Sequence, residues 1–180
     1  MENSFSTVKN ITSTKQSYFD KNLNFQYPNF LSCGGLRTLG HFKKSLNDKP
    51  LISIITTSLN SSETIEKTIQ SVLNQSYDNI EFIIVDGNST DDTINIIKKY
   101  EKFIDFWFSE KDNGIFDGMN KGIKISTGDI IGILNSDDIY TKDALLLAKK
   151  YFEKKIDYLF GSVKKERLLS GFNKKKIEWK

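Results

Sequence analysis

The sequence has one cysteine, one histidine and no long apolar run. Cys33 cannot form a disulfide within the chain, which predicts a reducing compartment, the cytoplasm. His41 has no neighbour in the sequence that would orient it as a ligand or a base, and no Cys/His spacing typical of zinc occurs. Apolar stretches such as residues 130–134 are too short to cross a bilayer, so we expect no transmembrane segment.

Charge of one sign is also scarce over the chain as a whole. The 26 basic and 23 acidic side chains leave a net charge of +3, which is too small to predict a nucleic-acid partner. Lysines and an arginine do gather in residues 164–180, a pattern typical of a solvated tail. We interpret residues 163–180 as a basic tail or as the start of an acceptor-binding region, and peripheral contact with an anionic membrane stays open.

Two nucleotide-binding fingerprints are missing. No G-x-G-x-x-G follows the first expected strand, and no G-x-x-x-x-G-K-[ST] occurs anywhere in the chain. These absences argue against dinucleotide oxidoreductases and P-loop phosphotransferases.

The character of the sequence changes at Pro50. Residues 1–49 are rich in Asn, Ser, Thr and Lys without clean periodicity, and we treat them as an N-terminal extension of unknown role. From Leu51, short β-branched runs alternate with amphipathic stretches. This alternation predicts an α/β domain over residues 50–162, with a mostly parallel sheet covered by helices on both faces.

The individual elements follow from hydrophobic period and capping signals. We expect strands at residues 52–57, 81–85, 103–109, 130–134 and 158–161. The helix after the first strand carries an apolar stripe and is expected to be capped by Ser61 or Ser62, and the next is expected to begin with a capping box of Ser89 and Asp92. Phe116, Met119 and Ile123 predict a short third helix, and a fourth opens at Thr141.

Polar loops follow three of the expected strands, at residues 57–60, 86–91 and 135–138. Ligands of open parallel sheets bind at the carboxyl ends of the strands, so these loops together predict a binding site, although any one of them alone is better explained as a turn. The adjacent carboxylates of Asp137 and Asp138 repel each other, and Mg²⁺ or Mn²⁺ would relieve this repulsion. The alternative is a helix-capping pair.

Five blocks of the sequence resemble family 2 glycosyltransferases in order and spacing. They are residues 51–60 (LISIITTSLN), 71–77 (SVLNQSY), 84–93 (IVDGNSTDDT), 109–123 (SEKDNGIFDGMNKGI) and 127–138 (TGDIIGILNSDD). The resemblance covers roughly residues 50–162 and implies a GT-A fold, with shortening at its C-terminal end as an open alternative. It implies transfer of a sugar from a nucleoside diphosphate sugar, UDP-linked, to a saccharide or lipid-linked acceptor hydroxyl, with inversion, in a bacterial-type polysaccharide or glycoconjugate pathway.

The resemblance also implies roles for single residues. Thr57 and Ser58 would lie against the nucleoside, Glu63 would brace that pocket, and Asp86 would accept a hydrogen bond from the base. The block similar to the sugar and diphosphate neighbourhood contributes Asp112, Asp117 and Lys121.

The metal ligands are implied in the same way. Asp137 matches the last acid of the family's D-x-D motif, and with Asn135 at the first position it would hold Mn²⁺ or Mg²⁺ on the diphosphate. Asn135 departs from the motif, because it removes one negative charge from the site.

A second departure concerns the catalytic base. Inverting members use an Asp or Glu well beyond the D-x-D, whereas this chain ends at Lys180, so the base stays unassigned. One rival interpretation is therefore a donor-binding fragment without turnover, lacking the acceptor half and the base. A nucleotidyltransferase is the other rival, but residues 57–62 lack the glycine and the basic residue that its loop needs.

Overall fold

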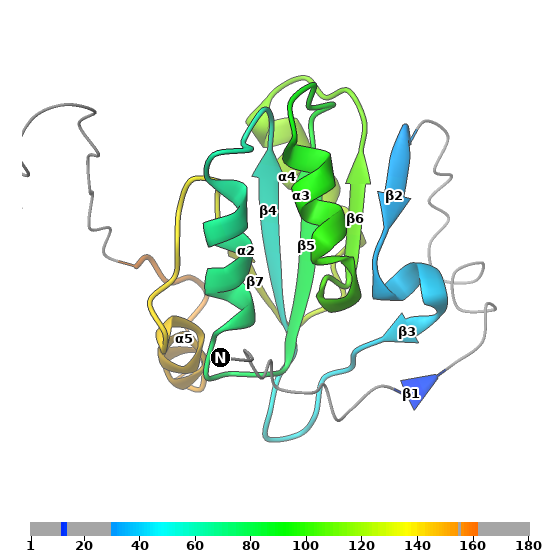
Figure 1. The fold of residues 1–180 in the computed structure, drawn as a ribbon. Helices are drawn as coiled ribbons and strands as arrows, with labels where there is room; N and C mark the ends of the chain where they lie inside the picture. Colours follow the sequence, from blue (N-terminus) through cyan, green and yellow to red (C-terminus); the bar gives the residue numbers. More distant parts are fainter. Residues whose placement is uncertain (1–11, 14–29, 155, 162–180) are drawn as a thin grey trace, which may run out of the picture.

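A five-stranded sheet with the order β2-β6-β5-β4-β7 is the centre of the structure (Figure 1). The structure is a computed structural model that describes residues 12–13, 30–154 and 156–161. The basic tail expected at residues 163–180 and most of residues 1–29 lie outside the described residues.

Four neighbouring strands of this sheet run parallel to one another. They are β4 (Ile52–Ser58), β5 (Ile80–Asp86), β6 (Phe106–Ser109) and β7 (Ile130–Ile133). β2 (Ser32–Gly34) pairs antiparallel with β6 at one edge, and β1 (Thr12–Ser13) pairs with β3 (His41–Phe42) in a separate sheet. The prediction of a mostly parallel α/β sheet is confirmed, and every residue of β4 and β5 is buried.

Helices cover both faces of the sheet. α2 (Ile65–Leu73) and α3 (Thr93–Lys99) lie on one face, and α4 (Ile115–Ile125) lies on the other (Figure 1). α5 (Ala144–Phe152) lies near the amino ends of the strands, and two short 3₁₀ turns are η1 (Leu36–Leu39) and η2 (Glu101–Phe103). The larger core cluster packs between the sheet and α2 and α3, and a smaller one around Phe106 and Phe108 includes Ile125 of α4.

Part of the N-terminal extension joins this sheet. Besides forming β2, it places the buried Arg37 of η1 against β5, where the guanidinium pairs with Glu81 and donates to the carbonyl of Ile125 at 2.8 Å. Lys43 forms a second ion pair, with Asp105 at 2.8 Å. Residues 30–43 therefore contribute a strand and two cations to the fold, a role that their sequence did not reveal.

Glu81 is the buried anion that needs Arg37. Its carboxylate also accepts hydrogen bonds from the hydroxyl of Ser53 and from the backbone and hydroxyl of Thr127. Burial raises the pKa of Glu81, but the charge of Arg37 and these hydrogen bonds outweigh burial and hold the pKa below its ordinary value. The ionised carboxylate is thus the stable form in the folded chain.

The short helix predicted from Phe116, Met119 and Ile123 is present as α4, but its buried face is formed by other residues. Phe116 is 75% exposed and Ile123 is 41% exposed, whereas Gly118, Gly122 and Ile125 are buried against the sheet. A Cβ on Gly122 would lie 2.4 Å from Cγ2 of Ile55, so glycine allows the helix to approach β4 closely. The hydrophobic period did not predict the buried face of α4, because the glycines on that face add no apolar signal to the sequence.

Three smaller expectations are also wrong. α2 begins without a side-chain cap, and the carbonyl of Ser61, not its hydroxyl, accepts the N–H groups of Thr64 and Ile65. At the start of α3 the carboxylate of Asp91, not a capping box of Ser89 and Asp92, accepts the N–H of Thr93. The hydroxyl of Ser89 bonds to Asp86 instead of capping α3. Residues 158–161 form no strand. The strand expected at 103–109 is shorter than predicted, because β6 begins at Phe106.

Replacing Arg37 by alanine should lower the free energy of unfolding by about 3–5 kcal/mol, because it leaves the Glu81 carboxylate buried without its cation. Urea denaturation at neutral pH, followed by circular dichroism, measures this change. In the wild-type chain, the contribution of Glu81 is present above the ordinary carboxyl pKa and is lost as pH falls through the lowered pKa.

The control is Lys149→Ala, which removes a partner of the exposed Glu153 and should change stability by less than about 1 kcal/mol. An Arg37→Ala protein as stable as the wild type would show that the Arg37–Glu81 pair adds nothing to stability.

Candidate functional site

The polar loops after β4, β5 and β7 meet at the carboxyl end of the sheet. The backbone N–H of Asn60 donates to the hydroxyl of Ser89 at 2.8 Å, and the N–H of Thr90 donates to the side-chain oxygen of Asn60 at 2.8 Å. The hydroxyls of Ser61 and Ser136 lie 2.8 Å apart, which joins the loop after β7 to the loop after β4. The predicted convergence of these loops is therefore confirmed.

Asp86, the last residue of β5, is completely buried at this edge. One carboxylate oxygen accepts from the hydroxyls of Ser58 (3.1 Å) and Ser89, and the other accepts from the N–H of Ser89 (2.9 Å) and the hydroxyl of Ser109 (2.7 Å). The chain itself thus supplies two donors to each oxygen. In this arrangement Asp86 organises the strand ends, and its contact with a nucleobase stays a prediction.

Ser58, Asp86 and Ser109 also lie side by side in the register of the sheet. Ser58 pairs with Asp86 across β4 and β5, and Asp86 pairs with Ser109 across β5 and β6. The sequence did not single out Ser109, although a polar residue at the end of each of three buried strands was a usable signal.

Thr57 and Asp112 are brought together beside this cluster. The hydroxyl of Thr57 is buried and has no hydrogen-bond partner among the described residues. Asp112, in the loop after β6, accepts the N–H of Gly114 at 2.9 Å through Oδ1. A Cβ built on Gly118 would lie 3.1 Å from Cγ2 of Thr57 and 3.3 Å from Oδ2 of Asp112, so the two side chains flank the same point of α4.

Lys121 of α4 lies between two carboxylates. Its amine is 2.7 Å from Glu110 and 3.2 Å from Asp117. Burial lowers the pKa of Lys121, but the hydrogen bonds and charges of Glu110 and Asp117 outweigh burial and raise the pKa above its ordinary value. The lysine is therefore charged at neutral pH, and its charge is already balanced by neighbours.

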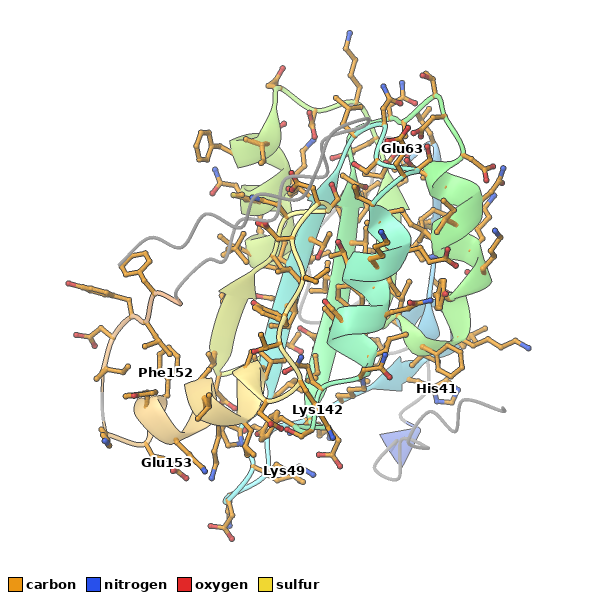
Figure 2. All side chains as sticks on the ribbon, turned by 60° about the vertical axis from the view of Figure 1, so that its left-hand side comes forward. His41, Lys49, Glu63, Lys142, Phe152 and Glu153 are labelled. Atoms are coloured by element: carbon orange, nitrogen blue, oxygen red, sulfur yellow. The ribbon has the colours of Figure 1, made fainter. Side chains whose placement is uncertain are left out.

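Glu63 lies at the same end of the molecule, far from Lys49 at the amino ends of the strands (Figure 2). Its side chain is exposed and makes no hydrogen bond or ion pair within the part of the chain that the structure describes. It is free to contact a ligand, but nothing in the fold directs it toward one.

The acidic turn after β7 is fixed by a helix on the other side of the loop. The hydroxyl of Thr68, in α2, lies within hydrogen-bond distance of the carbonyls of Ser136 (2.9 Å) and Asp138 (2.8 Å). The side-chain oxygen of Asn135 is buried without a hydrogen-bond partner among the described residues, and the Asp137 side chain is exposed. Thr68 escaped the sequence analysis because it interrupts an apolar stripe without any motif.

This turn fits a hard divalent cation with few protein ligands. Among the described residues, no group of three or more His, Cys, Asp or Glu side chains could hold a metal ion. An orphan amide oxygen on Asn135 and an exposed carboxylate on Asp137 are nevertheless oxygen ligands of the kind that Mg²⁺ and Mn²⁺ accept when phosphates and water complete the shell.

A cavity of about 660 Å³ lies at the opposite end of the strands. Residues 45–50, the start of β7 and the C-terminal part of α5 line it, including Phe152 and Glu153 (Figure 2). It contains none of the residues assigned from sequence, so it is separate from the carboxyl-end site.

The profile of the family described as Glycosyl transferase family 2 matches residues 53–179. This chain belongs to glycosyl transferase family 2. Relatives with similar sequences include a Bacillus subtilis protein named as a teichuronic acid biosynthesis glycosyltransferase, TuaG, which is 42% identical over 102 residues, 55% of this chain and 40% of that protein. The chondroitin synthase of Escherichia coli is 34% identical over 116 residues, 61% of this chain and 16% of the synthase. The family 2 chain thus spans less than half the length of these relatives.

Solved structures show that the fold is that of GT-A glycosyltransferases. Residues 1–349 of S. aureus TarS superpose with a TM-score of 0.54 at 24% identity, covering 58% of this chain and 32% of TarS. The mannosyltransferase PcManGT of Pyrobaculum calidifontis, in complex with GDP-Man and Mn²⁺, superposes with a TM-score of 0.55 at 23% identity, covering 62% of this chain and 34% of PcManGT. The predicted family and fold class are confirmed. None of the described helices of this family 2 chain has the length and apolar character needed to span a bilayer.

Replacing Asp86 by asparagine should lower the free energy of unfolding by about 2 kcal/mol, because one carboxylate oxygen that accepts two hydrogen bonds becomes an amide donor. The measurement is urea denaturation beside Asp92→Asn. The exposed Asp92 side chain bonds only Asn95, so that control should change stability by less than about 0.5 kcal/mol. If Asp86→Asn kept full stability and lost only nucleotide affinity, Asp86 would be a base-reading residue as the sequence suggested.

Proposed function

We propose that this chain is the nucleotide-sugar-binding part of a glycosyltransferase that moves a sugar from a UDP-sugar to an acceptor hydroxyl. The observation that carries the proposal is the convergence of the loops after β4, β5 and β7 beside the buried Asp86 cluster, at the carboxyl end of a GT-A sheet. Support for the donor class comes from TarS, which has been solved in complex with UDP-GlcNAc and whose fold this chain shares with a TM-score of 0.53.

The donor contacts fall to the residues with unused hydrogen-bonding groups. The buried hydroxyl of Thr57 and the free oxygen of Asp112 face the nucleotide sugar, and Glu63 closes the exposed side of the pocket. Ser58 and Asp86 support these contacts indirectly, because the hydrogen bond between them fixes the relative positions of the ends of β4 and β5. Lys121 and Asp117 form the polar wall on the α4 side.

Asn135 and Asp137 would hold Mn²⁺ or Mg²⁺ in this proposal. When bound, the cation neutralises charge on the diphosphate and so stabilises the departing nucleoside diphosphate. The chain contributes the fixed turn: the contacts of Thr68 with the Ser136 and Asp138 carbonyls hold the backbone on both sides of Asp137. The complex of PcManGT with GDP-Man and Mn²⁺ supports a divalent metal in this fold.

The acceptor side of the reaction is assigned by family alone. We propose a saccharide or lipid-linked acceptor, inversion at the anomeric carbon, and action at the cytoplasmic side of the cell, in line with the name of the relative TuaG. Inversion requires a base that removes the proton of the acceptor hydroxyl, and we assign that base to none of the described residues.

Isothermal titration of UDP with and without Mn²⁺, followed by an assay of UDP release from several UDP-sugars, tests the proposal. We expect metal-dependent binding, and release that increases when an acceptor saccharide is added. Binding without release would favour a donor-binding fragment, the rival interpretation. A folded chain that binds no nucleotide in either condition would refute the proposed function.

Replacing Asp137 by alanine should weaken Mn²⁺-dependent UDP binding by at least about tenfold, since losing a ligand should cost no less than losing a residue that orients one. Calorimetry with Mn²⁺ measures the loss, and titration without metal should show little difference. Asp138→Ala is the matched control, because it removes the same charge from the next residue while leaving the Asp137 carboxylate in place. Equal losses in both variants would mean that general acidity, not ligation, matters at this turn.

A further inference from the structure

Two glycines, Gly87 and Gly118, lie against the same carboxylate oxygen of Asp112. Gly87 directly follows β5, and Gly118 lies in the interior of α4. Among the described glycines, those with left-handed φ are Gly35, Gly40 and Gly114. The backbone conformation therefore does not demand glycine at position 87 or 118, and glycine within a helix costs stability relative to alanine.

Space, rather than backbone conformation, explains both glycines. A Cβ on Gly87 would lie 2.8 Å from Oδ2 of Asp112 and 3.2 Å from its Cγ, which requires the carboxylate to move. A Cβ on Gly118 would lie 3.3 Å from the same Oδ2 and 3.1 Å from Cγ2 of Thr57. The two missing side chains thus leave a seat for one carboxylate between the end of β5 and α4.

The seated oxygen is the one that the chain does not use. Oδ1 of Asp112 accepts the N–H of Gly114, whereas Oδ2 has no hydrogen-bond partner among the described residues. An ionised carboxylate accepts hydrogen bonds and repels phosphate oxygens, so on a nucleotide sugar the groups that suit it are O–H and N–H groups. The buried hydroxyl of Thr57, also without a described partner, lies beside it.

We propose that Gly87 and Gly118 are positioning residues: because they have no Cβ, the Asp112 carboxylate keeps the place in which its Oδ2 receives a hydrogen bond from an O–H or N–H group of the nucleotide sugar. The inference rests on the proposed function and deepens it. Asp112 makes the contact with the donor, and the glycines act only through Asp112.

Gly87→Ala and Gly118→Ala test this inference, with affinity for UDP and for UDP-GlcNAc measured calorimetrically in Mn²⁺. In Gly87→Ala the new Cβ meets the end of the flexible Asp112 side chain, so the melting temperature of this variant should change little. Affinity should fall about tenfold to a hundredfold, the value of a hydrogen bond to a charged group. A loss for both ligands places the donated hydrogen on the nucleoside, and a loss for UDP-GlcNAc alone places it on the sugar.

Two other positions of α4 provide matched controls. Gly122→Ala introduces a Cβ 2.4 Å from Cγ2 of Ile55 in the core, so it should lower the melting temperature while the folded fraction keeps its affinity. Asn120→Ala changes an exposed side chain of the same helix, so it serves as a folded control even if Gly122→Ala unfolds the chain. Both should bind UDP as the wild type does.

A double-mutant cycle separates positioning from general damage. In an Asp112→Ala background, Gly87→Ala should cause no further loss of affinity, because the side chain that it displaces is gone. Additive losses, or wild-type affinity of Gly87→Ala and Gly118→Ala for both ligands, would overturn the inference while leaving the proposed function intact. A wild-type chain that binds neither ligand would overturn both. A crystal structure of Gly87→Ala should show the Asp112 carboxylate displaced, and an unmoved carboxylate would also refute the inference.

Discussion

The buried carboxylate of Asp86 constrains the whole carboxyl-end surface of this sheet. A charge removed from water is stable only when its hydrogen-bonding capacity is filled, and here the donors come from β4, β6 and the loop that follows β5. The ends of β4, β5 and β6 must therefore keep their relative positions, because otherwise the buried charge of Asp86 would lose hydrogen bonds. Thr57 directly precedes Ser58 and Gly87 directly follows Asp86, so the same requirement fixes the positions of Thr57 and Gly87.

β5 carries a second buried carboxylate near its other end, and the two are stabilised differently. Glu81 is paired with a full positive charge on Arg37, whereas Asp86 is held by hydroxyls and a backbone N–H. The cation at the amino end comes from the segment that precedes the parallel domain, which makes residues 30–43 part of the core in energetic terms. Among the described residues no cation pairs with Asp86, so the two ends of β5 differ in charge.

The sequence predicted those parts of the fold whose signal is hydrophobic. The bounds of β4 and β5 were predicted to within one residue, and the presence of α2 was predicted, because their apolar periods are regular. The buried face of α4 was missed because Gly118 and Gly122 pack through their lack of a side chain, and β2 with Arg37 was missed because a short edge strand has no period to detect. The convergence of the polar loops followed from the topology. Sequence alone could not tell that the carboxylate of Asp86 faces its own serines, since the identity of a carboxylate does not reveal its partners.

Charge balance at the carboxyl end bears on how a diphosphate could bind there. Lys121 is a cation of α4, but Glu110 and Asp117 already neutralise it, so it offers little net attraction to phosphate oxygens. The acids of the turn after β7 would repel a diphosphate unless a divalent cation lay between them. Asn135 reduces that repulsion by one charge relative to an aspartate, and it also removes part of the attraction for the metal. A site built in this way should bind metal weakly alone and more tightly together with the nucleotide, because each ion supplies the charge that the other lacks.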